Sequence, residues 1–385
     1  MPNDSSSLLR RLALYYFFTF GALGWFFPQL PIFVERAVGV AWVGAVMVAF
    51  PLFGLLTAPL WGYTADRYRA SARLLVGTTA AMAPVVLLYS GARSFSTLLL
   101  ITTLFALLRA PQVPLADALA HRQLEGEHHR FARCRIWGSV GFVLFAAVSG
   151  SLGGVDAGAA YLVTPALCYL LAAGAMVGVV EPVGLSPRMS VGREVLALMR
   201  RPTMWRALAG VLVYYSGHSL FDAYFGLHVA ALGLPAGHAS LGWSFGALVE
   251  IGMMIVAPTL LARVEGRRML TPVSLLAALR WALTSVVRNP LLLIAVQGLH
   301  GFSFGLWYLS IIHHLQASTS PSLRASVQGV TVAVWGAAQV MGYGLGGLLL
   351  RQWPTTTLYH SAALISLVAA GLFLLVPAAR KETHQ

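Results

Sequence analysis

Residues 241–261 read LGWSFGALVEIGMMIVAPTLL, an apolar run with a single acidic residue, Glu250, near its centre. A second apolar run, MLTPVSLLAALRWALTSVV at residues 269–287, holds a single basic residue, Arg280. About 20 predominantly apolar residues cross a bilayer as a helix. A charge at that depth is costly unless it is paired or faces water. The two runs therefore predict membrane-spanning helices whose embedded charges have a function.

The rest of the chain has the same apolar character. Of its 385 residues, 58% are hydrophobic and 10% are charged, whereas soluble domains carry about 25% charged residues. Windows of about 20 residues resolve twelve apolar stretches, so we predict an all-α membrane protein with twelve transmembrane helices. These stretches cover residues 12–34, 40–62, 73–91, 95–118, 136–153, 158–180, 205–231, 239–262, 270–287, 290–313, 327–349 and 357–377.

The basic residues indicate which loops face the cytoplasm. The chain has 26 Lys and Arg against 13 Asp and Glu, a formal net charge of +13. Most of the basic residues fall in alternate loops, and the opposite loops hold only Arg36, Arg93, Arg288 and Arg351. Because cytoplasmic loops carry the Lys and Arg excess, we predict a cell inner membrane protein with both termini in the cytoplasm. Charge spread in this way faces anionic lipid and does not indicate nucleic-acid binding.

Neither the cysteines nor the histidines suggest a metal, a cofactor or an enzyme. Cys134 and Cys168 are predicted in a cytoplasmic loop and in a span, and they indicate no disulfide and no metal site. The motifs of metalloproteases and of nucleophilic enzymes are missing from the sequence. A membrane enzyme is therefore a weak alternative, which would have to use the loop histidines His121, His128, His129, His313 and His314.

A weak internal repeat divides the chain. The Ala-Pro pair at residues 58–59, followed seven residues later by an acid, recurs at residues 257–258. The sequence LLLI at residues 98–101 recurs at 291–294. Two parallel halves with a binding site near the bilayer midplane are typical of one group of secondary transporters.

Two longer cytoplasmic loops are predicted, at residues 119–135 and 181–204. The second loop separates the predicted halves. We therefore predict an N-terminal six-helix bundle over residues 1–180, a cytoplasmic linker over 181–204 and a C-terminal six-helix bundle over 205–385.

The loop after the second predicted span reads GYTADRYR at residues 62–69. It resembles the Gly-x-x-x-Asp-Arg-x-x-Arg loop of the major facilitator superfamily. The resemblance implies the major facilitator fold, transport by alternating access, and a gate to which Asp66 and Arg67 contribute. The second-half copy at residues 262–268 is degenerate, so we do not expect both halves to gate alike.

Several further segments resemble the lactose-permease-like symporters of this superfamily, and within them the 3-phenylpropionate transporter branch. This narrower resemblance implies proton-coupled uptake of a small organic solute, with an aromatic acid as one candidate. The segments are GALGWFFPQLPIF at 21–33, PLADAL at 114–119, RCRIWGSVGF at 133–142, Glu250, LRW at 279–281 and QGLHG at 297–301.

Three ionisable residues on consecutive predicted spans share one depth. At about 1.5 Å per helical residue, Glu250 and Arg280 lie roughly 18 and 15 Å above the inner ends of their spans. His300 falls near mid-bilayer on the next span, with Gln297 one turn away on the same face. The alternative is a static buried ion pair, which is not obviously stabilising. We predict instead that Glu250 carries the coupled proton, with Arg280 competing for its carboxylate and His300 as a second proton carrier.

The first half holds the other embedded charges. Arg109 lies in the fourth predicted span beside Pro111 and Pro114, which free backbone carbonyls. We predict that Arg109 binds a substrate carboxylate, because Arg suits bidentate recognition; the alternative is snorkelling or pairing with Asp117. Asp117 is expected to meet Arg135 or the region of Arg133, at the inner end of the fifth span, as a gate or a structural bridge.

Other polar and aromatic residues are candidates for substrate contact. His218 is placed near the midplane of the seventh span, with Asp222 one turn further on the same face. For any single aromatic residue, helix packing is the plain alternative. The full set of predicted substrate-binding residues is Arg109, Gln297, His218, Asp222, Tyr215, Trp25 and Gln29.

The sequence thus predicts a monomeric, proton-coupled symporter for a small organic solute, whose partners are the solute, protons and the lipid bilayer. A carboxylic acid, aromatic or otherwise, is the favoured substrate class. Two alternatives stay open: symport of a neutral solute such as a nucleoside or an oligosaccharide, and efflux of drugs or metabolites.

Overall fold

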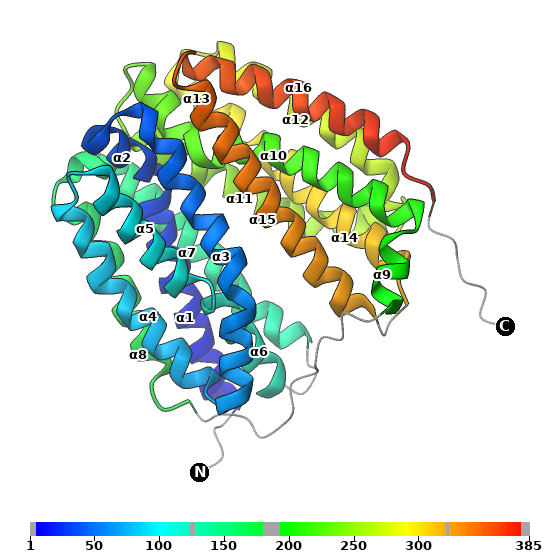
Figure 1. Cartoon of the computed structure of the whole chain (residues 1–385), viewed down its shortest axis with the longest axis horizontal. Helices are drawn as coiled ribbons and strands as arrows, with labels where there is room; N and C mark the ends of the chain where they lie inside the picture. Colours follow the sequence, from blue (N-terminus) through cyan, green and yellow to red (C-terminus); the bar gives the residue numbers. More distant parts are fainter. Residues whose placement is uncertain (1–4, 124–127, 180–192, 321–322, 379–385) are drawn as a thin grey trace. The chain divides into compact units, whose positions relative to one another are not determined.

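The computed structural model describes residues 5–123, 128–179, 193–320 and 323–378, and within these ranges the regular structure is helical throughout (Figure 1). The all-α prediction is therefore confirmed for the described part of the chain. The helices up to residue 176 are α1 (Ser5–Phe26), η1 (Phe27–Gln29), α2 (Leu30–Val38), α3 (Val40–Tyr68), α4 (Ser71–Leu88), η2 (Tyr89–Gly91), α5 (Phe95–Arg109), α6 (Gln112–Gln123), α7 (His128–Ser151), η3 (Gly154–Ala157) and α8 (Ala160–Met176).

The helices of the later part are longer on average. They are α9 (Arg193–Met199), α10 (Pro202–Ala231), α11 (Gly237–Leu261), α12 (Gly266–Val286), α13 (Pro290–Gln297), η4 (Gly301–Leu306), α14 (Trp307–Ala317), α15 (Arg324–Leu349) and α16 (Thr355–Leu374).

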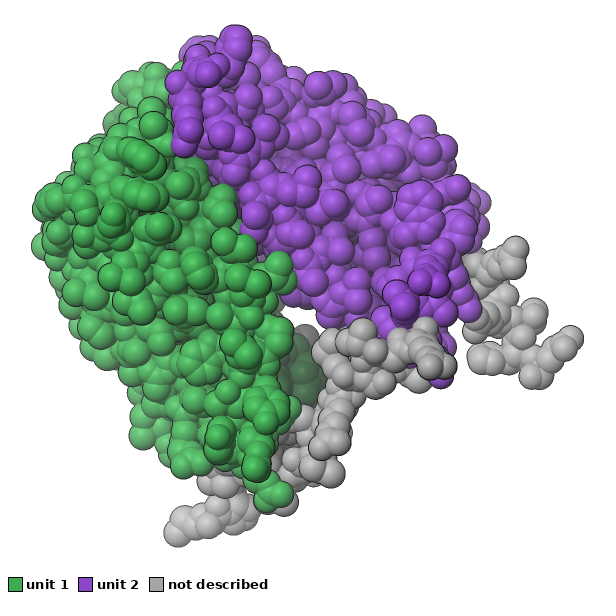
Figure 2. All heavy atoms as spheres, in the orientation of Figure 1, with its two compact units in different colours: residues 1–186, 225–244 green, residues 187–224, 245–385 purple. Residues whose placement is uncertain are grey.

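The chain forms two compact units, shown in different colours in Figure 2. The first unit comprises residues 1–186 and 225–244, and the second comprises 187–224 and 245–385. In the first unit α1 packs against α7 and α8, and α4 packs against α8. In the second unit α12 packs against α16 and α14. Each unit has its own buried hydrophobic cluster.

Ten helical segments of the described chain are long and apolar enough to span a membrane, rather than the twelve predicted. The apolar helix α8 has 17 residues, which is shorter than the other ten. Helix α10 has 30 residues but is too polar to count by composition, because it carries Tyr214, Tyr215, His218 and Asp222. A multi-pass membrane protein follows from these helices.

The loops also differ from the expectation. Residues 119–135, predicted as a loop, are largely helical, because α6 continues to Gln123 and α7 begins at His128. Of the predicted linker 181–204, residues 181–192 lie outside the described part, and the remainder forms α9 and the start of α10.

Three spans are interrupted, two of them at a proline. Proline lacks the amide hydrogen that an α-helix needs. In the first span Pro28 lies in the 3-10 turn η1, and in the fourth Pro111 separates α5 from α6. The tenth span widens into the π-helical turn η4 directly after His300. Such turns are frequent at functional sites.

Small residues set the closest helix contacts. A Cβ atom on Gly141 would collide with the carbonyl oxygen of Phe17, which places α7 directly on α1. In the second unit, a Cβ on Gly342 of α15 would collide with the carbonyl oxygen of Ser216 on α10. Small residues permit such backbone approach between membrane helices.

We predict that Gly141→Ala destabilises the first unit by about 1–3 kcal/mol, because the added methyl group meets backbone that cannot swing aside. The measurement is the thermal unfolding midpoint of the purified protein in detergent. Gly77→Ala in α4, where a Cβ has open space within 4 Å, is the matched control and should leave the midpoint unchanged or slightly raised. Equal midpoints for the two variants would contradict the close α1–α7 contact.

Candidate functional site

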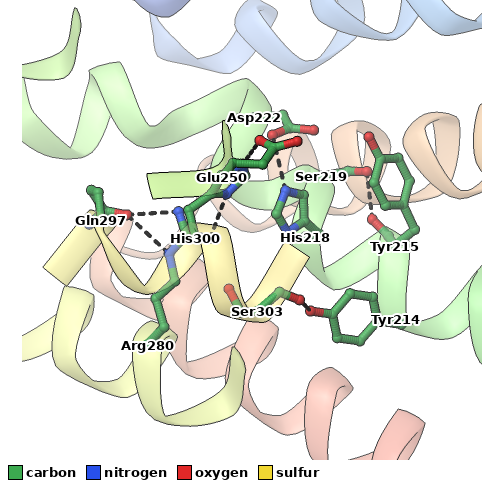
Figure 3. A network of polar contacts seen from close by, with 10 residues as sticks. All are labelled: Tyr214, Tyr215, His218, Ser219, Asp222, Glu250, Arg280, Gln297, His300 and Ser303. Carbon is green, nitrogen blue, oxygen red and sulfur yellow. Dashed lines mark hydrogen bonds and ion pairs between the residues drawn. The ribbon is translucent and has the colours of Figure 1, made fainter. Parts of the chain in front are cut away.

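A buried polar network in the second unit is centred on Arg280 of α12 (Figure 3). The Arg280 side chain is fully buried at 0% exposure. Its Nη2 and Nε donate to Oε1 of Gln297, at 2.8 and 3.2 Å. Gln297 in turn is held by its own Nε2, which donates to Thr284 Oγ1 at 3.3 Å and to the Leu293 carbonyl at 3.2 Å. The amide oxygen of Gln297 is therefore oriented toward the guanidinium.

The third partner of the guanidinium is His300. Arg280 Nη1 lies 3.1 Å from His300 Nδ1, and His300 Nε2 lies 3.0 Å from Glu250 Oε2. A guanidinium has only donors, so Nδ1 must act as the acceptor. A neutral imidazole then carries its hydrogen on Nε2 and donates it to Glu250. We assign this tautomer from the hydrogen-bond directions, and the result is a directed chain from Arg280 through His300 to Glu250.

Glu250 and Arg280 therefore do not meet directly in the described structure. The sequence predicted competition between a proton and Arg280 for one carboxylate, with His300 as a separate candidate. The structure instead places the imidazole of His300 between them. The imidazole can bridge the two charged groups because it has a nitrogen on each side of the ring. One nitrogen contacts the Arg280 guanidinium and the other contacts the Glu250 carboxylate.

Two aromatic rings complete the surroundings of the guanidinium. The Arg280 Cζ lies 4.4 Å from the ring centroid of Phe221 and 4.2 Å from that of Trp281. A cation held over ring faces gains electrostatic stabilisation in a desolvated site. The sequence analysis did not select Phe221. The signal that could have identified it is its position directly before Asp222, on the same helix as His218.

His218 and Asp222 of α10 lie against this chain. His218 Nε2 is 3.6 Å from Asp222 Oδ1, which is within ion-pair distance but longer than a hydrogen bond. The His218 ring centroid is 5.3 Å from that of His300 and 5.5 Å from that of Tyr215, whose ring is nearly parallel at 12°. The structure thus brings seven of the predicted site residues together: Glu250, Arg280, His300, Gln297, His218, Asp222 and Tyr215 (Figure 3).

Close packing places His300 opposite Glu250. A Cβ on Gly301 would lie 2.6 Å from the Val249 carbonyl carbon and 2.7 Å from the Glu250 backbone nitrogen. Helix α11 therefore packs directly on the start of the π-helical turn η4. That contact sets Glu250 beside the imidazole of the preceding residue, and only glycine at position 301 permits it.

The remaining predicted residues lie in the first unit. Arg109, at the end of α5, is half-buried, and its guanidinium lies 6.0 Å from the ring centroid of Phe20. Within the described chain its side chain makes no hydrogen bond and no ion pair. Gln112, three residues later, is fully buried, and neither atom of its side-chain amide has a hydrogen-bond partner in the described structure. Sequence reasoning did not select Gln112, although its place between two prolines marked it.

Asp117 does not pair with Arg135 as predicted. Its Oδ1 accepts a hydrogen bond from the Tyr16 hydroxyl at 2.5 Å. The Arg135 guanidinium instead lies over the rings of Tyr16 and Phe20, at 5.2 and 4.4 Å from their centroids. Tyr16 therefore separates the acid from the base, and the expected direct bridge is corrected to an acid–phenol contact.

Gln29 is engaged by protein groups at both ends of its amide. Its Nε2 donates to Ser240 Oγ at 2.7 Å, and its Oε1 accepts from the Val155 backbone nitrogen at 2.5 Å. These bonds tie the broken first span to η3 and to the start of α11. Trp25 is likewise buried, at 3% exposure. Contact of these two residues with substrate stays a prediction.

Asp66 and Arg67, the predicted gate residues, are exposed in the last turn of α3. Arg67 is well placed there, because a cation near a helix C-terminus interacts favourably with the helix dipole. The helix ends at Tyr68, and it is capped by Arg69, whose φ of 48° is left-handed and whose backbone N–H donates to the Ala65 carbonyl. A gating role for Asp66 and Arg67 stays a prediction.

Comparisons with known proteins agree with this architecture. The chain matches the family model described as "MFS_1 like family" over residues 9–361. It is 27% identical to the maltose permease of Geobacillus stearothermophilus, over 96% of this chain and 94% of that protein. It is 29% identical to a probable 3-phenylpropionic acid transporter of Escherichia coli (strain K12), over 94% of this chain and 96% of that protein.

A solved structure shares the fold. The crystal structure of the nucleoside transporter NupG superposes with a TM-score of 0.85, covering 96% of this chain and 98% of that chain at 17% sequence identity. A single-residue mutant of the same transporter gives a TM-score of 0.86.

We predict that His300→Phe destabilises the second unit by about 1–3 kcal/mol, because it leaves a guanidinium donor and a carboxylate without their hydrogen-bond partner. His360→Phe, an exposed position in α16, is the control and should change little. The measurement is thermal unfolding in detergent. A midpoint for His300→Phe equal to that of the control would contradict the bridging role.

Proposed function

This chain belongs to the MFS_1 like family of membrane transporters, and we propose that it is a secondary active transporter that takes up a small organic solute together with protons. The observation that carries the proposal is the directed chain Arg280–His300–Glu250 in the second unit, in which Arg280 and His300 are buried and the Glu250 side chain is 17% exposed. Such a chain is not expected to be kept for stability alone, because the attraction between buried charged groups only partly offsets the cost of desolvating them.

The chain can couple protonation to rearrangement. His300 accepts from Arg280 through Nδ1, so a proton that binds at Nδ1 must displace the guanidinium. A proton on Glu250 weakens the charge-assisted bond from His300. Either event changes which contacts hold α11, α12 and the tenth span together. Proton binding on one side of the membrane and release on the other would then accompany alternating access.

We place recognition of an acidic solute at Arg109 of the first unit. Its guanidinium has no hydrogen bond or ion pair among the described residues, and the unpaired amide of Gln112 is three residues away. A substrate carboxylate would supply the missing acceptor, with bidentate geometry available. The name of the 3-phenylpropionic acid transporter supports an acid of this kind.

A neutral solute is the second candidate. The names of two other relatives favour it. One is the maltose permease, and the other is a putative nucleoside transporter that is 20% identical to this chain. Drug or metabolite efflux is a third possible function for the same architecture.

We also propose an inner-membrane location with both termini in the cytoplasm, and a monomer as the working unit.

We predict that Glu250→Gln abolishes uphill uptake driven by a pH gradient while downhill exchange continues, because the amide can accept from His300 but cannot carry a proton. The assay is flux in proteoliposomes with 3-phenylpropionate, maltose and uridine as probe solutes. Glu194→Gln, exposed in α9, is the control and should retain uphill uptake. Gradient-driven accumulation by Glu250→Gln would sink the proton assignment.

We predict that Arg109→Ala raises the half-saturation concentration for an acid by about 10- to 100-fold, the loss of one or two charge-assisted hydrogen bonds. Uptake of a neutral probe should change much less. Arg93→Ala, at an exposed position, serves as the control. If acid and neutral uptake suffer equally in Arg109→Ala, the carboxylate role is wrong.

A further inference from the structure

The buried site of the second unit holds one more acid than base. Its formal charges are the guanidinium of Arg280, the carboxylate of Asp222 and the carboxylate of Glu250, whose side chain is 17% exposed. Figure 3 shows both carboxylates on the same side of the two imidazole rings. With both acids ionised and both histidines neutral, the cluster carries one uncompensated negative charge. Such a charge is costly in a desolvated interior, and one bound proton removes it.

The proton is not placed on either histidine. His300 already accepts from Arg280 through Nδ1, so an imidazolium there would point a second N–H at a guanidinium. His218 is 2% exposed, and its Nδ1 has no hydrogen-bond partner in the described structure. A charged His218 would bury an unsatisfied N–H donor, which is a heavier cost than an unused lone pair. The two carboxyl groups are the remaining sites.

Among the described residues, the groups around Asp222 supply no second cation. Its own helix presents His218 and the Tyr215 phenol, α11 presents Glu250, and the tenth span presents His300. The other neighbours are the Arg280 guanidinium from α12 and the Tyr343 phenol from α15. Within the described part of the chain, Arg280 is therefore the guanidinium that balances both acids.

We propose that Asp222 and Glu250 share a single proton, so that the proton-coupling unit of this transporter is the pair of carboxyl groups balanced by Arg280. The proposal rests on the proton coupling proposed above and deepens it. It also moves Asp222 from substrate contact to proton handling. In a cycle the proton enters from water on one side, is held by either carboxyl group as an O–H bond, and leaves as a hydrated proton on the other.

The sharing has a distinctive consequence for single variants. Removing either acid leaves one carboxylate and one guanidinium, which are neutral together and need no proton. Asp222→Asn and Glu250→Gln should therefore each lose the same protonated carboxyl group. If Glu250 held its proton independently of Asp222, Asp222→Asn would lose an ionised carboxylate and keep the acid.

The test is infrared difference spectroscopy of the full-length protein in lipid at neutral pH, in H₂O and in D₂O. Wild type minus Asp222→Asn should show one carboxylic acid band, and wild type minus Glu250→Gln should show the same band at about the same intensity. Asp156→Asn, whose acid is half-exposed beside Arg36, should show loss of a carboxylate and no acid band. Arg280→Gln, which leaves two acids without a cation, should about double the acid signal.

Two outcomes overturn the shared proton: an acid band lost in only one of the two single variants, or in neither. Thermal unfolding of each variant accompanies the spectra, and the two single-acid variants keep a neutral cluster, so both are expected to fold. If the bands appear as expected but solute flux by the wild type does not depend on a pH gradient, the proposed proton coupling is wrong. The shared proton is then still supported. If flux follows the gradient but the bands do not match, the sharing fails and the coupling stands.

Discussion

One buried guanidinium constrains the second unit more than any other group. Arg280 has no exposure to solvent, so each of its N–H donors must find an acceptor within the protein or lie against an aromatic face. Gln297 accepts two of the bonds and His300 a third, while Phe221 and Trp281 cover the planar faces. Because His300 is used as an acceptor, its other nitrogen must donate, and this determines where Glu250 has to lie. Through these bonds Arg280 connects α12 to the tenth span and, by way of His300, to α11.

Both units place an aromatic polar ring between an acid and a base. In the second unit the ring is the imidazole of His300, between Glu250 and Arg280. In the first it is the phenol of Tyr16, between Asp117 and Arg135. A direct buried ion pair is held by strong attraction and is hard to break. A ring placed between the two charges weakens their direct attraction. A proton or a substrate can then replace one of the hydrogen bonds to the ring, which suits a protein that changes conformation.

Backbone chemistry explains where the helices break and where they touch. Prolines lie at the interruptions of the first and fourth spans, where each removes a hydrogen-bond donor, whereas others such as Pro51 and Pro258 lie inside continuous helices. Glycines permit the closest approaches, at Gly141 against Phe17 and at Gly301 against Glu250. These positions were visible as residue types in the sequence. The helix that each glycine would meet was not, because the contact joins segments far apart in the chain.

The sequence by itself determined that the chain is a bundle of membrane helices, since long apolar runs must satisfy their backbone hydrogen bonds internally. It also determined that Glu250, Arg280 and His300 share one depth, because helical rise is regular. The predicted count of twelve spans is not confirmed, since α8 is short and α10 carries the polar residues of the site. Only the tertiary structure decided the partners: His300 between Glu250 and Arg280, Tyr16 beside Asp117, and Gln29 tied to Ser240 and Val155. The reason is that depth follows from counting residues along one helix, whereas a partner depends on helix rotation and side-chain direction, which packing between distant segments sets.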